Sequence, residues 1–326
     1  MEKLKSKFNP LFFQASLAAG GVALMPFNFL QFGIPHGKGL IKISDIVWTQ
    51  FSAIQSLFYG VLIAVMLIAV LVHFILTIIF FAMMIGWIRE KTSMNELMSD
   101  PYRNVTIFPI IGSLAMSANV LWAPTGFFIP AISGGMQSLM MPSFVFFVGL
   151  WILAIILQFK VLKSWVSKSI DFKKYNFVWL LDVFAFGLVS LTGSGIAITS
   201  GNVNIATIAS LATILTIGFG FSLLNAKLVH LIAMLLKAKK LPDAPLLPAF
   251  FLVIPITCLY GLSTYRLMGY YSKLYNFSLE GIQPLIMNLS YVIAAFWLIS
   301  TVYLIRTYLV NHFLDSKYAA TQWGMV

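Results

Sequence analysis

Two long segments of this chain contain no charged residue. No Lys, Arg, Asp or Glu occurs between Asp45 and Arg89, or between Arg103 and Lys160. About 20 consecutive apolar residues suffice to cross a bilayer as a helix, so each segment holds at least one complete crossing. Only 10% of all residues are charged, whereas a soluble domain has about 25%. The sequence therefore predicts an all-α, polytopic membrane protein and excludes an ordinary water-soluble domain.

The hydropathy pattern predicts eight spans. They cover residues 10–31, 46–88, 105–122, 139–158, 177–199, 205–236, 246–265 and 282–305. As one helix the second run would be about 64 Å long, about twice the hydrocarbon thickness, so it is one projecting helix or two helices joined near Gly60. Residues 318–326 are uncharged and have the character of the first turns of a ninth helix, too short to cross. We therefore expect one transmembrane domain over residues 1–326. Residues 318–326 are either a short interfacial tail or, in a longer chain, the start of two further helices that this domain lacks here.

The distribution of basic residues predicts the topology. With the N-terminus in the cytoplasm and the second run as one helix, 17 of the 21 basic residues fall on the inside. Lys38, Lys42, Arg266 and Lys273 fall outside. This asymmetry is the positive-inside pattern of a multi-pass protein of the cell (inner) membrane, and it supports a single long second helix. It also explains the net charge of +11 without nucleic acid, so we expect the lipid bilayer as partner and no nucleic-acid binding.

Glycine and proline are concentrated in the odd-numbered spans. The residues are Gly20, Gly21, Pro26, Pro109, Gly112, Gly187, Gly193, Gly195, Pro248, Pro255 and Gly261. Breaks in a membrane helix are tolerated where the backbone faces other helices or a water-filled cavity. The pattern predicts that the odd spans form an inner ring and that the even spans face lipid. The alternative is that these residues serve only close helix packing.

Several stretches resemble a known family. The segments NPLFFQASLAAGGVALMPFNFLQF and DPYRNVTIFPIIGSLAMSANVLW, with a long helix between them, resemble the tellurite-resistance/dicarboxylate transporter (TDT) family, which includes the plant slow-type anion channels. The resemblance implies ten helices in five hairpins around a pseudo-symmetric central pore, and a homotrimer. On that plan this chain lacks its last two helices, including the ninth helix that carries the gating phenylalanine. A TsoY-like subgroup of the family includes selenoproteins, and the end at Val326 would fit termination at a selenocysteine codon.

The candidate pore-lining residues are small or polar residues of the odd spans. They are Gly20, Gly21, Pro26, Asn28, Pro109, Ser113, Thr192, Gly193, Ser194, Gly195 and Pro255. Gln14, Ser16, Ser117 and Asn119 share the same two interpretations, pore lining or helix packing. Phe186 and Phe251 are pore plugs only by analogy with the family.

Two ionisable residues lie deep in predicted spans. Asp182 is the acidic residue well inside a span, where an ionisable group is a candidate for proton coupling. Its place near the start of the fifth span favours a structural interaction with the helix N-terminus. His73 lies in the second span, and no second histidine at similar depth faces it as a haem ligand would, so we expect a hydrogen-bonded or lipid-boundary histidine.

Two functions remain after these observations. The first is a channel or carrier for a small anion or an organic or chalcogen-containing acid, with no enzyme activity, cofactor or metal. Its support is the nearly charge-free interior and the basic residues at the inner mouth, which attract anions. The second is a membrane redox component that exchanges electrons between quinone and a thiol or selenol partner. Cys258, the single cysteine, excludes an intrachain disulfide framework.

Overall fold

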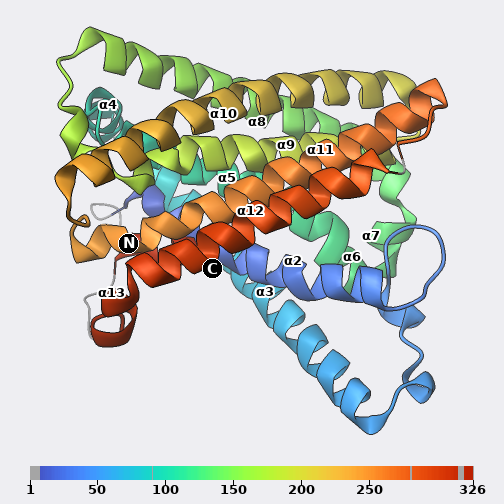
Figure 1. Ribbon diagram of the computed structural model, residues 1–326. Helices are drawn as coiled ribbons and strands as arrows, with labels where there is room; N and C mark the ends of the chain where they lie inside the picture. The colour runs from blue at the N-terminus through green and yellow to red at the C-terminus, as the bar shows by residue number, and fades with distance from the viewer. Residues whose placement is uncertain (1–7, 90, 280, 315–318, 326) are drawn as a thin grey trace.

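The computed structural model describes residues 8–89, 91–279, 281–314 and 319–325. Within these ranges the chain is mainly helical and forms no strand (Figure 1). Eight helical segments are long and apolar enough to cross a membrane. They are Pro10–Gly33, Ala53–Arg89, Asn104–Phe128, Met136–Ser167, Phe177–Thr199, Val203–Ala238, Ala244–Tyr275 and Ile282–Leu304. The prediction of an all-α, polytopic membrane protein is confirmed.

Four inner helices alternate along the chain with four outer ones. The inner helices are α2 (Phe13–Gly33), α5 (Phe108–Val120), α9 (Leu181–Thr199) and α11 (Val253–Tyr275). The outer helices are α3 (Ala53–Arg89), α8 (Met136–Ser167), α10 (Val203–Ala238) and α12 (Ile282–Leu304). The most apolar stretch of the Phe177–Thr199 span is 94% buried, whereas that of Ile282–Leu304 is 17% buried. The predicted inner and outer layers are therefore confirmed.

Every inner helix is entered through a 3-10 helix, and this feature repeats along the chain. The entering segments are η1 (Pro10–Phe12), η4 (Asn104–Ile107), η7 (Phe177–Leu180) and η8 (Ala244–Leu252). In two of them the local reason is the same. The side chains of Asn9 and Asn176 accept a hydrogen bond from the backbone N–H two residues on, which fixes the first turn. The four inner helices therefore share the same kind of first turn.

The remaining helices are short. They are η2 (Ile43–Asp45), η3 (Trp48–Gln50), α4 (Lys91–Ser99), η5 (Leu121–Thr125), α6 (Gly126–Phe128), α7 (Pro130–Gly134), η6 (Phe172–Lys174), α13 (Arg306–Asn311) and η9 (Ala320–Met325). Pro124 lies in the π-helical turn η5, where the inner span leaves regular α-helix. In Figure 1, α4 and α13 lie at one end of the bundle, and α6 and α7 lie at the other. We call the first the basic end, because most connecting lysines and arginines lie there.

The helix bounds confirm one sequence expectation and correct three others. The second run is one continuous helix, α3, as the charge count predicted. The seventh span extends ten residues beyond the predicted end at 265, so Arg266 and Lys273 belong to α11 and not to a loop. Lys227, counted with the inner connecting segments, lies within α10 and is 2% exposed. Ala320–Met325 forms a 3-10 helix, η9, where we expected α-helical turns.

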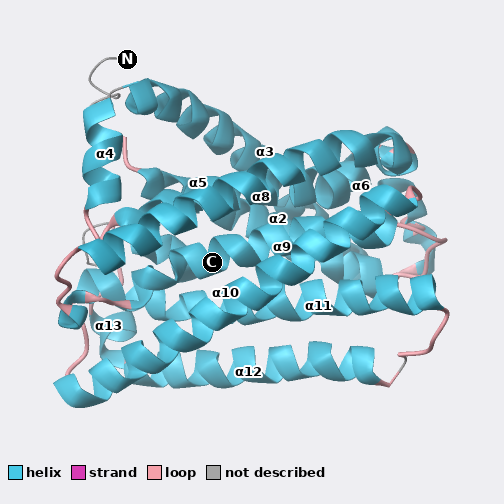
Figure 2. Cartoon of the chain, turned by 90° about the horizontal axis from the view of Figure 1, so that it is seen from above, coloured by secondary structure: helices cyan, strands magenta, loops and turns pink. Residues whose placement is uncertain are grey.

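The inner helices form a ring with one position left for η9. Helix α2 packs on α5, α5 packs on α9, and α9 packs on α11. The segment η9 packs against both α2 and η8, between the two ends of this series. The outer helices α3 and α12 lie at opposite edges of the bundle (Figure 2). The described chain thus encloses a space bordered by four inner helices and by η9.

Candidate functional site

A cavity of about 340 Å³ lies among the inner helices. Its walls come from α2, α5, α9 and α11, with contributions from η8, α12 and η9. The lining residues are Gln14, Leu17, Ala18, Gly21, Leu24, Met25, Asn28, Met116, Phe184, Leu188, Leu191, Leu252, Ile254, Pro255, Cys258, Leu259, Leu262, Tyr291, Trp323 and Gly324. All four inner helices and η9 thus contribute to this cavity.

One face of α2 forms the longest wall. Gln14, Leu17, Gly21, Leu24 and Asn28 recur every three or four residues, so their side chains share one side of the helix. With 1.5 Å per residue, this face follows the cavity for about 21 Å. No atom lies within 4 Å of the point where a Cβ on Gly21 would be, so the backbone borders open space there. The cavity is therefore elongated along the helix axis.

The lining is mainly apolar, with few polar groups. Gln14 is 5% exposed, and its side-chain oxygen has no hydrogen-bond partner among the described residues. Such a buried, unpaired oxygen costs free energy unless water or a ligand pairs with it. Asn28 and Tyr291 lie at the exposed margin. No charged side chain of the described residues lines this cavity.

Arg266 lies one helical turn beyond the cavity, on the face of α11 that lines it. Pro255, Leu259 and Leu262 line the cavity from α11, and Arg266 follows Leu262 by four residues on the same face. Its guanidinium lies 3.4 Å from the carbonyl oxygen of Leu191, itself a lining residue of α9. No carboxylate of the described residues forms an ion pair with Arg266. One unpaired cation thus stands beyond the uncharged cavity, toward the end opposite the basic end.

Three of the eleven predicted pore-lining residues border this cavity. They are Gly21, Asn28 and Pro255. The other eight are Gly20, Pro26, Pro109, Ser113, Thr192, Gly193, Ser194 and Gly195, none of which lines it. Phe186 and Phe251, which only the analogy with the family suggests as plugs, are buried and lie outside the lining as well.

Contacts between helices or within a helix account for those eight residues. Ser113 lies 2.6 Å from Ser16 across the α2–α5 contact, and Thr192 accepts a hydrogen bond from Asn119 across the α5–α9 contact. A Cβ on Gly193 would meet Thr213 of α10 at 2.2 Å. Ser194 donates to the carbonyl of its own helix at Leu191. Gly20 lies against Met116 and His73, and Gly195 lies against Trp122 and Arg266. Pro26 and Pro109 are buried within their helices.

His73 joins three helices through its two ring nitrogens. Its Nδ1 lies 2.6 Å from the carbonyl oxygen of Ser16 on α2, and its Nε2 lies 2.9 Å from the hydroxyl of Ser117 on α5. The ring is fully buried. Because an outer helix here bonds to two inner ones, His73 is a hydrogen-bonded packing residue, as one of the two sequence interpretations had it.

Asp182 forms a buried ion pair with Lys227. Both carboxylate oxygens lie 2.6 Å from the Lys227 ammonium, whose third N–H donates to the carbonyl oxygen of Trp179 at 2.7 Å. The carboxylate also accepts from the backbone N–H of Val183 at 2.7 Å. Neither Asp182 nor Lys227 lines the cavity. The pair fastens the outer helix α10 to the inner helix α9.

Aromatic rings surround this ion pair. The ammonium lies 4.8 Å from the ring centre of Trp165 on α8 and 4.9 Å from that of Trp179 in η7. Tyr260 of α11 donates to the carbonyl of Val183, next to the pair. The ion pair and these rings therefore join α8, α9, α10 and α11 near the basic end.

Sequence reasoning missed the roles of Lys227 and Arg266. The sequence does hold a signal for both, because each lies in or beside a long apolar run. Counting them with the connecting segments hides that signal. The basic-residue count that predicts the topology thus includes two cations that are buried or half-buried. Depth in a span is the feature that separates them from the lysines of the connecting segments.

In comparisons with protein-family models, with curated proteins and with solved structures, no match to this chain was found.

Proposed function

We propose that this protein conducts or carries a small anion or organic acid across the membrane through the central cavity. The observation that carries the proposal is the arrangement of an uncharged cavity among four inner helices with the unpaired Arg266 beyond one end. A cation on a pore path attracts anions and repels cations, and pore width and polar lining groups set selectivity. The resemblance of the sequence to the TDT family supports the same function.

The chemistry of the lining supports transport in place of catalysis. The cavity offers amide, hydroxyl and indole groups from Gln14, Asn28, Tyr291 and Trp323, and a single thiol from Cys258. A conduction path needs binding that is weak enough for release, and a few neutral polar groups provide that. We expect the basic end to face the cytoplasm, because lysine and arginine are retained on that side during insertion.

The test is anion flux in proteoliposomes with a matched pair of glycine variants. Gly21→Leu places a side chain in open space on the cavity wall, whereas Gly218→Leu places one in open space on the exposed side of the outer helix α10. We expect the first change to reduce flux at least tenfold and the second to leave it unchanged. Flux no greater than in protein-free vesicles, or equal flux in both variants, would contradict the proposal.

A further inference from the structure

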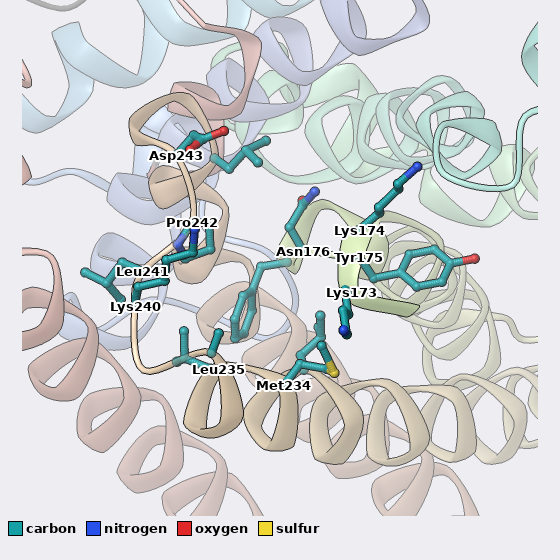
Figure 3. A pocket seen from close by; sticks show the side chains of 14 residues that line it. Lys173, Lys174, Tyr175, Asn176, Met234, Leu235, Lys240, Leu241, Pro242 and Asp243 are labelled. Carbon is teal, nitrogen blue, oxygen red and sulfur yellow. The ribbon is translucent and has the colours of Figure 1, made fainter. Parts of the chain in front are cut away.

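A second pocket lies at the basic end, between α10 and the two segments that lead into η7 and η8. It has a volume of about 350 Å³. Figure 3 shows Lys173 and Lys174 on the segment before η7, and Lys240 on the α10–η8 connection, on different sides of the opening. Asp243 is the one acidic residue of the lining. The pocket therefore carries an excess of positive charge and is separate from the central cavity.

The other part of the pocket is apolar. Leu231, Met234, Leu235 and Ala238 line it from one face of α10. On an adjacent face of the same helix, Val229 and Leu236 are 69% and 72% exposed. Large exposed apolar side chains in a span mark the lipid-facing surface, so that surface reaches the edge of the pocket. A ligand held there would touch lysine ammonium groups and bilayer hydrocarbon together.

The three lysines of the pocket have few partners within the described part of the protein. None of the three lysines forms an ion pair with a carboxylate of the described residues. Lys174 lies 5.4 Å from the ring centre of Tyr102, which draws it to one side. Lys173 and Lys240 are exposed and are the cations best placed for an anion from the membrane.

Tyr175, which lines the pocket beside Lys174, stays neutral. Burial, and then the nearby Tyr102 and Asp100, raise the pKa of Tyr175 to about 12, so the phenol stays protonated. Tyr175 stacks on Trp179 with ring centres 4.0 Å apart. Trp179 is one of the two rings around Lys227. The pocket wall is thus continuous with the contacts that fasten α9 to α10.

We propose that this pocket binds the headgroup of an anionic phospholipid from the leaflet at the basic end. Basic pockets between membrane helices on the cytoplasmic side suit such headgroups, and each lysine near an anionic surface contributes about fivefold to binding. The phosphate lies between Lys173 and Lys240, and an acyl chain follows the apolar face of α10. This proposal does not depend on the transport function, because none of its residues lines the central cavity.

The experiment counts lipids retained by the full-length protein. Purified protein is titrated with phosphatidylglycerol, phosphatidylcholine or inorganic phosphate, and bound molecules are measured by native mass spectrometry. The pocket variant is Lys173→Gln/Lys240→Gln, and the control is Lys237→Gln/Lys239→Gln. The control removes the same charge from the same end, but its residues do not line the pocket.

We expect the pocket variant to bind phosphatidylglycerol about tenfold more weakly or worse, and the control variant to bind like wild type. Phosphatidylcholine should bind much more weakly than phosphatidylglycerol, and inorganic phosphate should not displace the lipid. Equal losses in the two variants would reduce the effect to general surface charge and overturn the proposal. Displacement by inorganic phosphate would identify a free-phosphate site instead of a lipid site.

Discussion

The ammonium of Lys227 lies 2.6 Å from each carboxylate oxygen of Asp182, and the two side chains are 2% and 0% exposed. All three N–H groups of the ammonium have acceptors, the third being the carbonyl of Trp179. Removal of one partner from a buried pair leaves an uncompensated charge, whereas removal of both can be nearly neutral. A double-mutant cycle of Asp182 and Lys227 therefore tests whether the two side chains stabilise the protein as a pair.

For stability, we expect the single changes to be worse than the double change. Lys227→Met or Asp182→Asn alone should lower the free energy of unfolding, by roughly 3–5 kcal/mol for the lysine change, which leaves a buried carboxylate. The double variant should recover most of that loss. Thermal unfolding in detergent, followed by size-exclusion chromatography, measures all four members of the cycle. Additive losses in the double variant would contradict the pairing.

For transport, the same double variant tests proton coupling by Asp182. The pair lies outside the cavity lining, so we expect anion flux and its pH dependence to remain as in wild type. Flux is measured in proteoliposomes at several pH values on both sides of the membrane. A pH dependence that disappears in Asp182→Asn/Lys227→Met would instead assign proton coupling to this carboxylate.

The sequence could predict the layers of this fold but not the partner of Asp182. Charge-free runs and clustered Gly and Pro identify spans and inner helices, because both reflect the cost of polar backbone in lipid. From the turn at Gly201, Asp182 is nineteen residues back and Lys227 is twenty-six residues on. A simple hairpin register would thus leave them about 10 Å apart along the axis. Helical side chains lean toward the N-terminus, so Lys227 reaches back toward Asp182 across that offset.

The candidate site was less predictable for a related reason. Inner helices are apolar on every side, so composition does not tell which face borders the cavity and which packs against a neighbour. Gly20 and Gly21 are adjacent and chemically identical, yet one contacts Met116 and His73 and the other borders open space. Only the rotation of α2 in the packed bundle distinguishes them.

That difference predicts opposite effects of alanine at the two glycines. A Cβ at Gly20 would lie 2.4 Å from Met116 Cγ and 2.9 Å from His73 Nδ1, and His73 is held by two hydrogen bonds. We expect Gly20→Ala to destabilise the protein by about 1–3 kcal/mol through overpacking. Gly21→Ala should be neutral or slightly stabilising, because alanine favours helix. Thermal unfolding of both variants decides the matter, and equal midpoints would contradict the placement.

The single cysteine provides a probe of the cavity. Cys258 lines it from α11 and is partly exposed. We expect small thiol reagents to modify wild-type protein in vesicles and to reduce anion flux, because the added group fills part of a space of about 340 Å³. Cys258→Ala, which has no thiol, should keep its flux during the same treatment. Complete modification with unchanged flux would place the conduction path elsewhere.

Arg266 should determine charge selectivity. Its guanidinium is the unpaired cation beyond the cavity, on the lining faces of α9 and α11. We expect Arg266→Gln to lower the ratio of anion to cation permeability severalfold, because the attraction for anions is lost. Arg266→Lys keeps the charge and should retain most of that ratio. Permeability ratios are measured from reversal potentials in planar bilayers, with thermal unfolding as the control for folding. If both variants were equally destabilised and the permeability ratio did not change, Arg266 would serve only to pack beside Gly195.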